Sequence, residues 1–142
     1  MLRSSIIRTF STYRPEATKL RKYLITKYKK HSLGCHCSMC MLQFPIELLD
    51  MSHLKPRHRL DRLELKNTNN VEFMCKMCHS LFDIGLVGVN YCGIIEFNLT
   101  LHNYAGLFIV GKLGTLYSKY SINNATFLEW HYRNIFLKQL AN

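Results

Sequence analysis

The chain has 142 residues, of which 48% are hydrophobic and 20% are charged, so it can bury one core and is not intrinsically disordered. Its longest apolar stretches, at 85–89 and 106–110, are much shorter than the roughly 20 residues of a membrane-spanning helix, so we expect no membrane span. The net charge of +10 is concentrated at 1–31 and 55–66, which favours a nucleic-acid partner over a membrane surface or a merely solvated basic face.

Residues 1–15 have the composition of a mitochondrial transit peptide. They contain three arginines, five Ser or Thr and no acid. The string at 8–11 (RTFS) resembles a presequence cleavage pattern and predicts a mature chain that starts near Ser11 and works in the mitochondrial matrix. The alternative is a basic arm on a cytoplasmic protein of a bacterium, phage or virus. Residues 16–142 are then predicted to form a single domain.

The first half of this domain begins with a basic helix. Residues 16–30 place apolar side chains at helical spacing directly after Pro15, which suits the start of a helix. Residues 33–45 contain Gly34 and Pro45 and predict an irregular turn. Residues 46–54 (IELLDMSHL) predict a buried strand with His53 near its end.

The second half alternates short strands and helices. Residues 57–70 are polar and predict a surface loop, and residues 71–74 predict a second strand. A helix is expected from Lys76 to near Gly85, followed by a hairpin at 87–97. Residues 126–140 predict a C-terminal helix whose apolar positions include Leu128, Ile135 and Leu140.

Four of the six cysteines form two CxxC pairs, each of which we call a knuckle. The pairs are Cys37/Cys40 and Cys75/Cys78. Four thiolates in two such pairs are the ligand set of a closed, tetrahedral, structural zinc site. A redox dithiol and a chance pairing are the alternatives. The remaining Cys35 and Cys92 are expected to be small buried side chains in a reducing compartment.

A second group of polar residues suits an open metal site. His79 and Asp83 are four residues apart on the predicted helix, so both project from one face and can hold one divalent cation. Water and a phosphate oxygen would complete the coordination, as metal-assisted phosphodiester hydrolysis requires. Taken singly, these residues could also cap the helix, and Asn70 could be a turn residue.

Three strings resemble the HNH endonuclease family. They are SHLKP at 52–56, NVEFMCKMCHSLFDIGLV at 70–87 and FLEWHYRNIF at 127–136. The resemblance is to a branch with a small residue before the first His and a CxxC…CxxC zinc site. It implies an α+β fold with a ββα-metal core (the His-Me finger) and a structural zinc. An N-terminal basic helix, a β-hairpin and a C-terminal helix would flank this core.

The resemblance also implies roles at the matching positions. His53 would be the general base that deprotonates the attacking water, and Asn70 would orient the His53 ring. His79 and Asp83 would hold Mg²⁺, Mn²⁺ or Ni²⁺. The reaction would hydrolyse DNA, with RNA as the alternative substrate, and leave 5′-phosphate and 3′-hydroxyl ends.

The sequence departs from the family at Ser52. Many members carry a metal-binding Asp or His at that position, so either two ligands suffice, or Asp50 assists, or the protein is an inactive, zinc-stabilised nucleic-acid-binding protein. A small zinc-folded interaction module is a third hypothesis. Arg57 and Arg59 are the candidate phosphate contacts. The sequence makes no prediction of oligomeric state.

Overall fold

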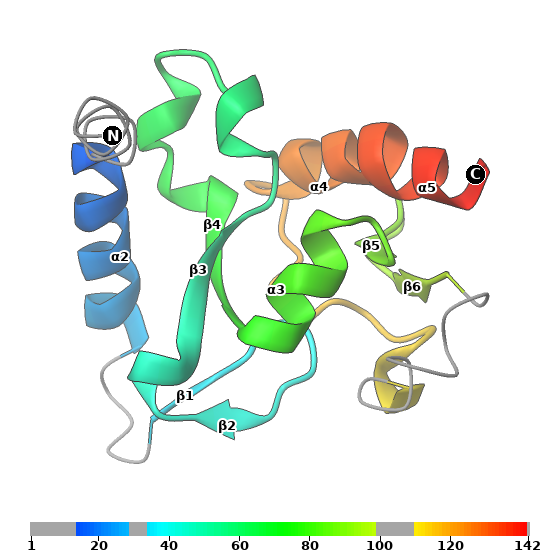
Figure 1. Ribbon diagram of the computed structural model, residues 1–142, viewed down its shortest axis with the longest axis horizontal. Coiled ribbons are helices and arrows are strands. Elements are labelled where there is room, and N and C mark those ends of the chain that lie inside the picture. Colours follow the sequence, from blue (N-terminus) through cyan, green and yellow to red (C-terminus); the bar gives the residue numbers. More distant parts are fainter. Residues whose placement is uncertain (1–13, 29–33, 99–109, 142) are drawn as a thin grey trace, which may run out of the picture.

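A two-stranded hairpin lies between two helices at the centre of the molecule (Figure 1). The computed structural model describes residues 14–28, 34–98 and 110–141. Residues 1–13 of the candidate presequence, including the cleavage pattern at 8–11, lie outside the described residues. Arg14 and Pro15 are described. The described elements pack around one buried core, and the mixed α+β fold confirms the predicted class.

Helix α2 (Pro15–Tyr28) forms as predicted and begins at its proline. Leu20 and Leu24, one helical turn apart, are buried against the hairpin. Arg21 reaches from the same helix to the main-chain oxygens of Ile46 and Leu49, at 3.2 and 3.1 Å. This contact fixes α2 beside the start of the central hairpin.

The first knuckle is the turn of a very small hairpin. Strands β1 (Cys35–His36) and β2 (Gln43–Phe44) pair antiparallel, so the prediction of a wholly irregular segment at 33–45 was wrong for these four residues. The main-chain N–H of Cys37 donates to the oxygen of Leu42 at 2.9 Å and extends the pairing into the turn. Met41 closes the turn at a φ of 65°, in the left-handed region.

The central hairpin consists of β3 (Leu49–His53) and β4 (Val71–Cys75), in a register that pairs Leu49 with Cys75 and His53 with Val71. The strand expected from residue 46 begins at 49, because Ile46–Leu48 follow Pro45 in a 3₁₀ turn, η1. The connection between the strands contains three further 3₁₀ turns, η2 (Arg57–Arg59), η3 (Glu64–Lys66) and η4 (Thr68–Asn70).

Helix α3 (Lys76–Asp83) follows β4 without a loop. The Cys75 sulfur caps its N-terminus by accepting from the Cys78 N–H. The helix ends before Gly85, whose φ of +81° provides the left-handed turn that follows many helices. A Cβ at Gly85 would lie 2.9 Å from the main-chain oxygen of Ile135, so glycine also permits the close approach of the C-terminal helix.

The hairpin β5 (Val87–Val89) and β6 (Ile95–Phe97) forms as predicted, with its turn held by the Asn90 side chain. After the short turn η7 (Val110–Lys112), a continuous C-terminal helix comprises α4 (Ala125–His131), the π-helical η8 (Tyr132–Phe136) and α5 (Leu137–Ala141). Leu128 of this helix is buried, whereas the Leu140 side chain is 47% exposed. No helix in the described ranges has the length and apolarity to cross a bilayer.

Candidate metal centre and active-site cleft

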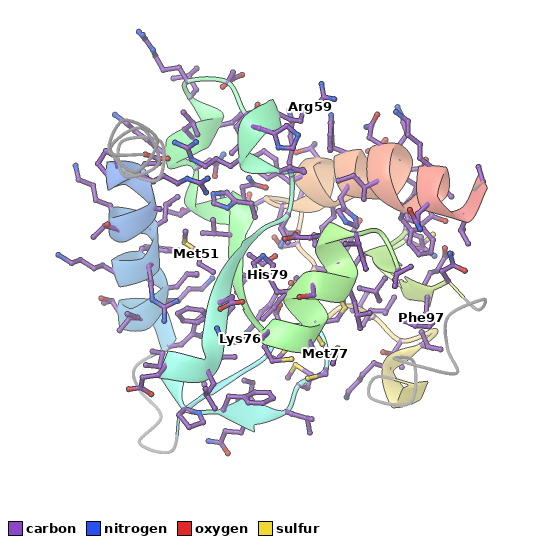
Figure 2. The ribbon with its side chains drawn as sticks, in the orientation of Figure 1. Met51, Arg59, Lys76, Met77, His79 and Phe97 are labelled. Carbon is purple, nitrogen blue, oxygen red and sulfur yellow. The ribbon has the colours of Figure 1, made fainter. Side chains whose placement is uncertain are left out.

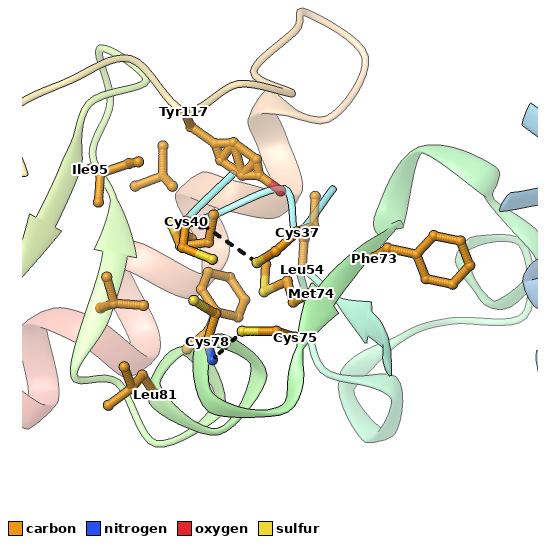
Figure 3. Close-up of a cluster of buried hydrophobic side chains, with 14 of the residues drawn as sticks. Cys37, Cys40, Leu54, Phe73, Met74, Cys75, Cys78, Leu81, Ile95 and Tyr117 are labelled. Atoms are coloured by element: carbon orange, nitrogen blue, oxygen red, sulfur yellow. Dashed lines mark hydrogen bonds between the residues drawn. The ribbon is translucent and has the colours of Figure 1, made fainter. Parts of the chain in front are cut away.

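The two knuckles meet in the core. The sulfur atoms of Cys37, Cys40, Cys75 and Cys78 all lie within 4.8 Å of one another, and all four residues are buried (Figure 3). A tetrahedral zinc with thiolate ligands requires sulfur–sulfur distances of about 3.8 Å, given Zn–S bonds of about 2.3 Å. The donor set and its convergence therefore fit a structural zinc.

The knuckle thiols lie close enough to shift one another's pKa. The Cys40 thiol beside Cys37 holds the pKa of Cys37 well below its ordinary value, and thiols of the other three cysteines raise the pKa of Cys78. From outside the group, the fully buried Tyr117 donates its hydroxyl to the Ser38 hydroxyl at 2.7 Å. The first knuckle is thus braced by a residue almost eighty positions away in the chain.

A cleft of about 440 Å³ lies between the start of α2 and the end of α3. Its lining includes three of the predicted site residues, His53, His79 and Asp83. The remaining lining comes from α2, β3, the turn after β3 and the C-terminal helix: Arg14, Ala17, Met51, Pro56, Arg57, His58 and Ile135. Histidines, a carboxylate and arginines therefore face the same space.

His79 is held between two carboxylates. Its Nε2 lies 3.0 Å from Asp83 Oδ2, and its Nδ1 lies 3.0 Å from Asp50 Oδ2 (Figure 2 shows His79 between α3 and β3). The carboxylate of Asp83 is the largest of the influences that raise the pKa of His79 to about 9, with Asp50 adding to it. His79 Nε2 and the Asp83 carboxylate are the pair of atoms that could hold a divalent cation, and the contact of Nδ1 with Asp50 would orient the ring.

His53 is the last residue of β3 and is half-buried at the cleft. Its buried Nε2 has no hydrogen-bond partner among the described residues. Burial, with help from the positive charges of Arg57 and Arg14, lowers the pKa of His53. The lowered pKa therefore favours the neutral form of the ring near neutral pH.

Asn70 closes the loop that follows His53. Its Oδ1 accepts from the Lys55 N–H at 2.8 Å, its Nδ2 donates to the Lys55 oxygen at 3.0 Å, and its main-chain oxygen accepts from Leu54. The expectation placed the amide on the His53 ring. The structure places it on the main chain two residues beyond, so Asn70 fixes the loop rather than the imidazole directly.

A family model described as HNH endonuclease matches residues 35–90. Residues 35–90, which are less than half of the chain, are therefore similar to the HNH endonuclease family. This HNH segment starts at β1 and ends just after β5, so it contains both knuckles together with His53, Asn70, His79 and Asp83. No curated protein matches the chain.

Ser52 and Asp50 of β3 are the two residues that the sequence raised as alternatives for a further metal ligand. Ser52 is fully buried, and its hydroxyl has no partner in the part of the chain that the structure describes. Asp50 lies two residues earlier on β3, hence on the same face, and contacts both Lys76 and His79 of α3. Asp50 therefore contacts the candidate ligand His79 directly, whereas Ser52 offers only a buried hydroxyl.

The two arginines predicted to contact phosphate are in different settings. Arg57 lines the cleft and is paired with Glu16. Arg59 is exposed and is not part of the cleft lining.

Three further residues at or beside the cleft, Arg14, Glu16 and His58, have no role that the sequence predicts. Arg14 and His58 line the cleft, and Glu16 reaches it through Arg57. The net positive charge of residues 1–31 is the one sequence feature that indicates a role for Arg14. No spacing signal joins Glu16 to Arg57, because the two are 41 positions apart.

Proposed function

We propose that this protein is a metal-dependent endonuclease that hydrolyses DNA phosphodiester bonds, and that zinc bound by the four cysteines stabilises its fold. The observation that carries the proposal is that His53, His79 and Asp83 line one cleft, with the buried Nε2 of His53 unpartnered among the described residues. The HNH match and the basic charge support a nucleic-acid substrate.

His53 acts as the general base in this proposal. A water molecule in the cleft loses its proton to the neutral imidazole as it attacks phosphorus. The lowered pKa of His53 keeps the base form populated at neutral pH. Asn70 keeps the base in place by clamping the main chain just beyond it, at Lys55.

His79 and Asp83 are the proposed ligands of a divalent cation such as Mg²⁺, Mn²⁺ or Ni²⁺. When bound, the cation would stabilise negative charge on the phosphate and on the departing 3′ oxygen. Asp50 holds the His79 ring through Nδ1, so that Nε2 faces Asp83. The departing oxygen takes a proton from solvent, and the products carry 5′-phosphate and 3′-hydroxyl ends.

The test is cleavage of supercoiled plasmid by purified, zinc-loaded protein with each of the three cations. Wild type is expected to nick the plasmid, and His53→Ala is expected to lose at least 100-fold in rate, with unchanged DNA binding. His36→Ala is the matched control, because His36 is exposed on β1 and outside the cleft lining. Absence of nicking with every cation, or full activity of His53→Ala, would reject the proposal.

A second candidate is a zinc-stabilised protein that binds nucleic acid without cleaving it. The buried Ser52 favours it, since the position that carries a metal ligand in many family members offers only a hydroxyl here. Salt-sensitive DNA binding without nicking under any cation is the outcome that this candidate predicts.

The site of action is a separate proposal. The basic, acid-free composition of residues 1–15 supports import into the mitochondrial matrix. Fusion of residues 1–15 to a fluorescent protein should direct it to mitochondria, and a diffuse cytoplasmic signal would contradict the proposal.

A further inference from the structure

Basic side chains approach the cleft from two separate parts of the chain. Arg14 precedes the first turn of α2, and Arg57 begins the turn η2 that follows β3. Both arginines line the cleft that contains His53, His79 and Asp83. Arg14 lies outside the HNH segment, which begins at residue 35.

Glu16, on the first turn of α2, holds Arg57 at this position. The Arg57 Nε donates to Glu16 Oε1 at 2.6 Å, and Nη2 contacts the same oxygen. The Glu16 side chain is 13% exposed and the Arg57 side chain 33%, so the pair is largely shielded from solvent. An ion pair in such a setting restrains the guanidinium more than an exposed pair would.

The geometry of the pair leaves part of the guanidinium available. A guanidinium has five N–H donors in a planar fork. Glu16 engages Nε and Nη2, so the two donors of Nη1 and one of Nη2 can still bind another acceptor. Oxygens of a phosphate suit this edge of an arginine because they accept two parallel hydrogen bonds.

We propose that the start of α2 completes the active site: Arg57, positioned by Glu16, binds the phosphate at the scissile bond, and Arg14 binds a phosphate next to it. The inference rests on the proposed endonuclease function and adds to it a positioning residue and a second phosphate contact. Glu16 is a positioning residue, since it acts through Arg57.

The electrostatics of the cleft agree with this assignment. Arg57 and Arg14 are the two positive charges that lower the pKa of His53, after burial, so both lie near the imidazole. Burial works against ionisation of Glu16. Hydrogen bonds from its own main-chain N–H and from Arg57 nevertheless hold its pKa below the ordinary value. The carboxylate is therefore charged and engaged at neutral pH.

The first arm of the test measures positioning. Glu16→Gln removes a negative charge, so electrostatics alone would tighten DNA binding, whereas loss of positioning would slow turnover. We expect kcat to fall about 10-fold with KM changed less than 2-fold. Arg57→Lys, which keeps the charge and loses the fork, should give the same loss. Glu47→Gln is the charge-matched control, because Glu47 is exposed outside the cleft lining.

The second arm measures phosphate contacts without cleavage. Binding of a short fluorescent duplex is followed by anisotropy against salt, with every variant in a His53→Ala background that leaves the DNA intact. Arg14→Gln and Arg57→Gln should each weaken binding about 5-fold and reduce the salt slope by about 0.9. Lys138→Gln, an exposed residue of α5, removes the same charge elsewhere and is the control.

The outcomes separate the inference from the function on which it rests. If Glu16→Gln and Arg57→Lys turn over like Glu47→Gln, the positioning role is wrong even though the nuclease is active. If Arg14→Gln matches Lys138→Gln in affinity and salt slope, Arg14 makes no phosphate contact. If wild type does not cleave, the endonuclease proposal fails, and the anisotropy arm still decides the two arginine contacts.

A thermal melt of each variant checks folding. If Glu16→Gln unfolds, Glu16→Asp replaces it, because aspartate keeps the charge and shortens the reach.

Discussion

The two candidate metal positions of this protein lie toward opposite ends of α3. They differ in burial and in the number of ligands that the protein provides. The four-cysteine group at the N-terminal end is buried, and its four sulfurs form a complete ligand set. The pair His79 and Asp83 toward the C-terminal end borders a cleft, and Asp83 is 56% exposed. A closed site suits a metal that only stabilises the fold, whereas an open site leaves coordination positions for a substrate.

Breaking the closed site is expected to have the largest effect. Cys75→Ser should abolish cooperative thermal unfolding, because structural zinc contributes on the order of 10 kcal/mol to folding in small domains. Circular dichroism and zinc content provide the measurement. Cys92→Ser is the control, since Cys92 is exposed, contrary to the expectation that it is buried, and should leave the melting temperature unchanged. A wild-type melt for Cys75→Ser would show that the cysteines do not hold the fold.

Breaking the open site should remove activity and spare the fold. Asp83→Asn is expected to lower cleavage more than 100-fold, since the cation contributes several kcal/mol to stabilising the transition state. The melting temperature and the single zinc per chain should be retained, while Mn²⁺ binding by calorimetry is lost. Glu129→Gln, on the surface of α4, is the control. If Asp83→Asn unfolds the protein or releases zinc, the two sites are not independent.

Substitution of Asn70 should lower both the stability of the fold and the rate of cleavage. Asn70→Ala removes two hydrogen bonds to Lys55 and leaves its partly buried main-chain groups without those partners, which should cost about 2 kcal/mol in unfolding free energy. Cleavage should fall as well, because this loop directly follows His53 at the end of β3. Urea unfolding measures the first effect. Asn69→Ala, at an exposed neighbour, should change stability by less than about 0.5 kcal/mol.

The smallest effect concerns the junction between α3 and the C-terminal helix. The buried His131 stacks on Phe82, with ring centroids 3.5 Å apart, and its Nε2 donates to the Phe82 oxygen at 2.6 Å. Burial lowers the pKa of His131 from 6.5 to about 4. The unfolded chain therefore takes up this proton first, so the stability contribution is complete above pH 6.5 and is lost as pH falls toward 4.

Urea unfolding at pH 7 and pH 5.5 tests this expectation. The wild type should lose about 1 kcal/mol more between these values than His131→Gln, which keeps a donor for the Phe82 oxygen and does not titrate. Comparing the two proteins cancels the titration of groups that they share, including His79. Equal losses in both would show that His131 is protonated in the fold or does not govern this junction.

The residues of both sites could be predicted where the geometry is local. The CxxC spacing and the four-residue interval between His79 and Asp83 depend on one turn or one helix, and the structure brings each set together. The strands β3 and β4, the helix α3 and the hairpin β5–β6 could also be predicted, because each depends on the hydrophobic pattern of a short stretch of sequence. Packing as a β–β–α unit then brought His53 to the same cleft as His79.

Tertiary contacts decided what could not be predicted. The contact of Asn70 with Lys55 instead of the His53 ring depends on how the long loop folds back on itself. The pair of Glu16 with Arg57 joins α2 to η2 and leaves no periodic signal. The π-helical segment η8 could not be predicted either, because the apolar spacing of residues 126–140 is that of one continuous α-helix.

Helix α3 is eight residues long, so about 12 Å of rigid rod joins the two ends that carry the cysteines and the cleft residues. Cys75 caps the helix and Asp83 ends it. A chain that has not yet acquired its metal, or whose thiols have been oxidised, would therefore lack an aligned His79 and Asp83. For the proposed endonuclease, this means that binding of zinc by the knuckles would have to precede cleavage.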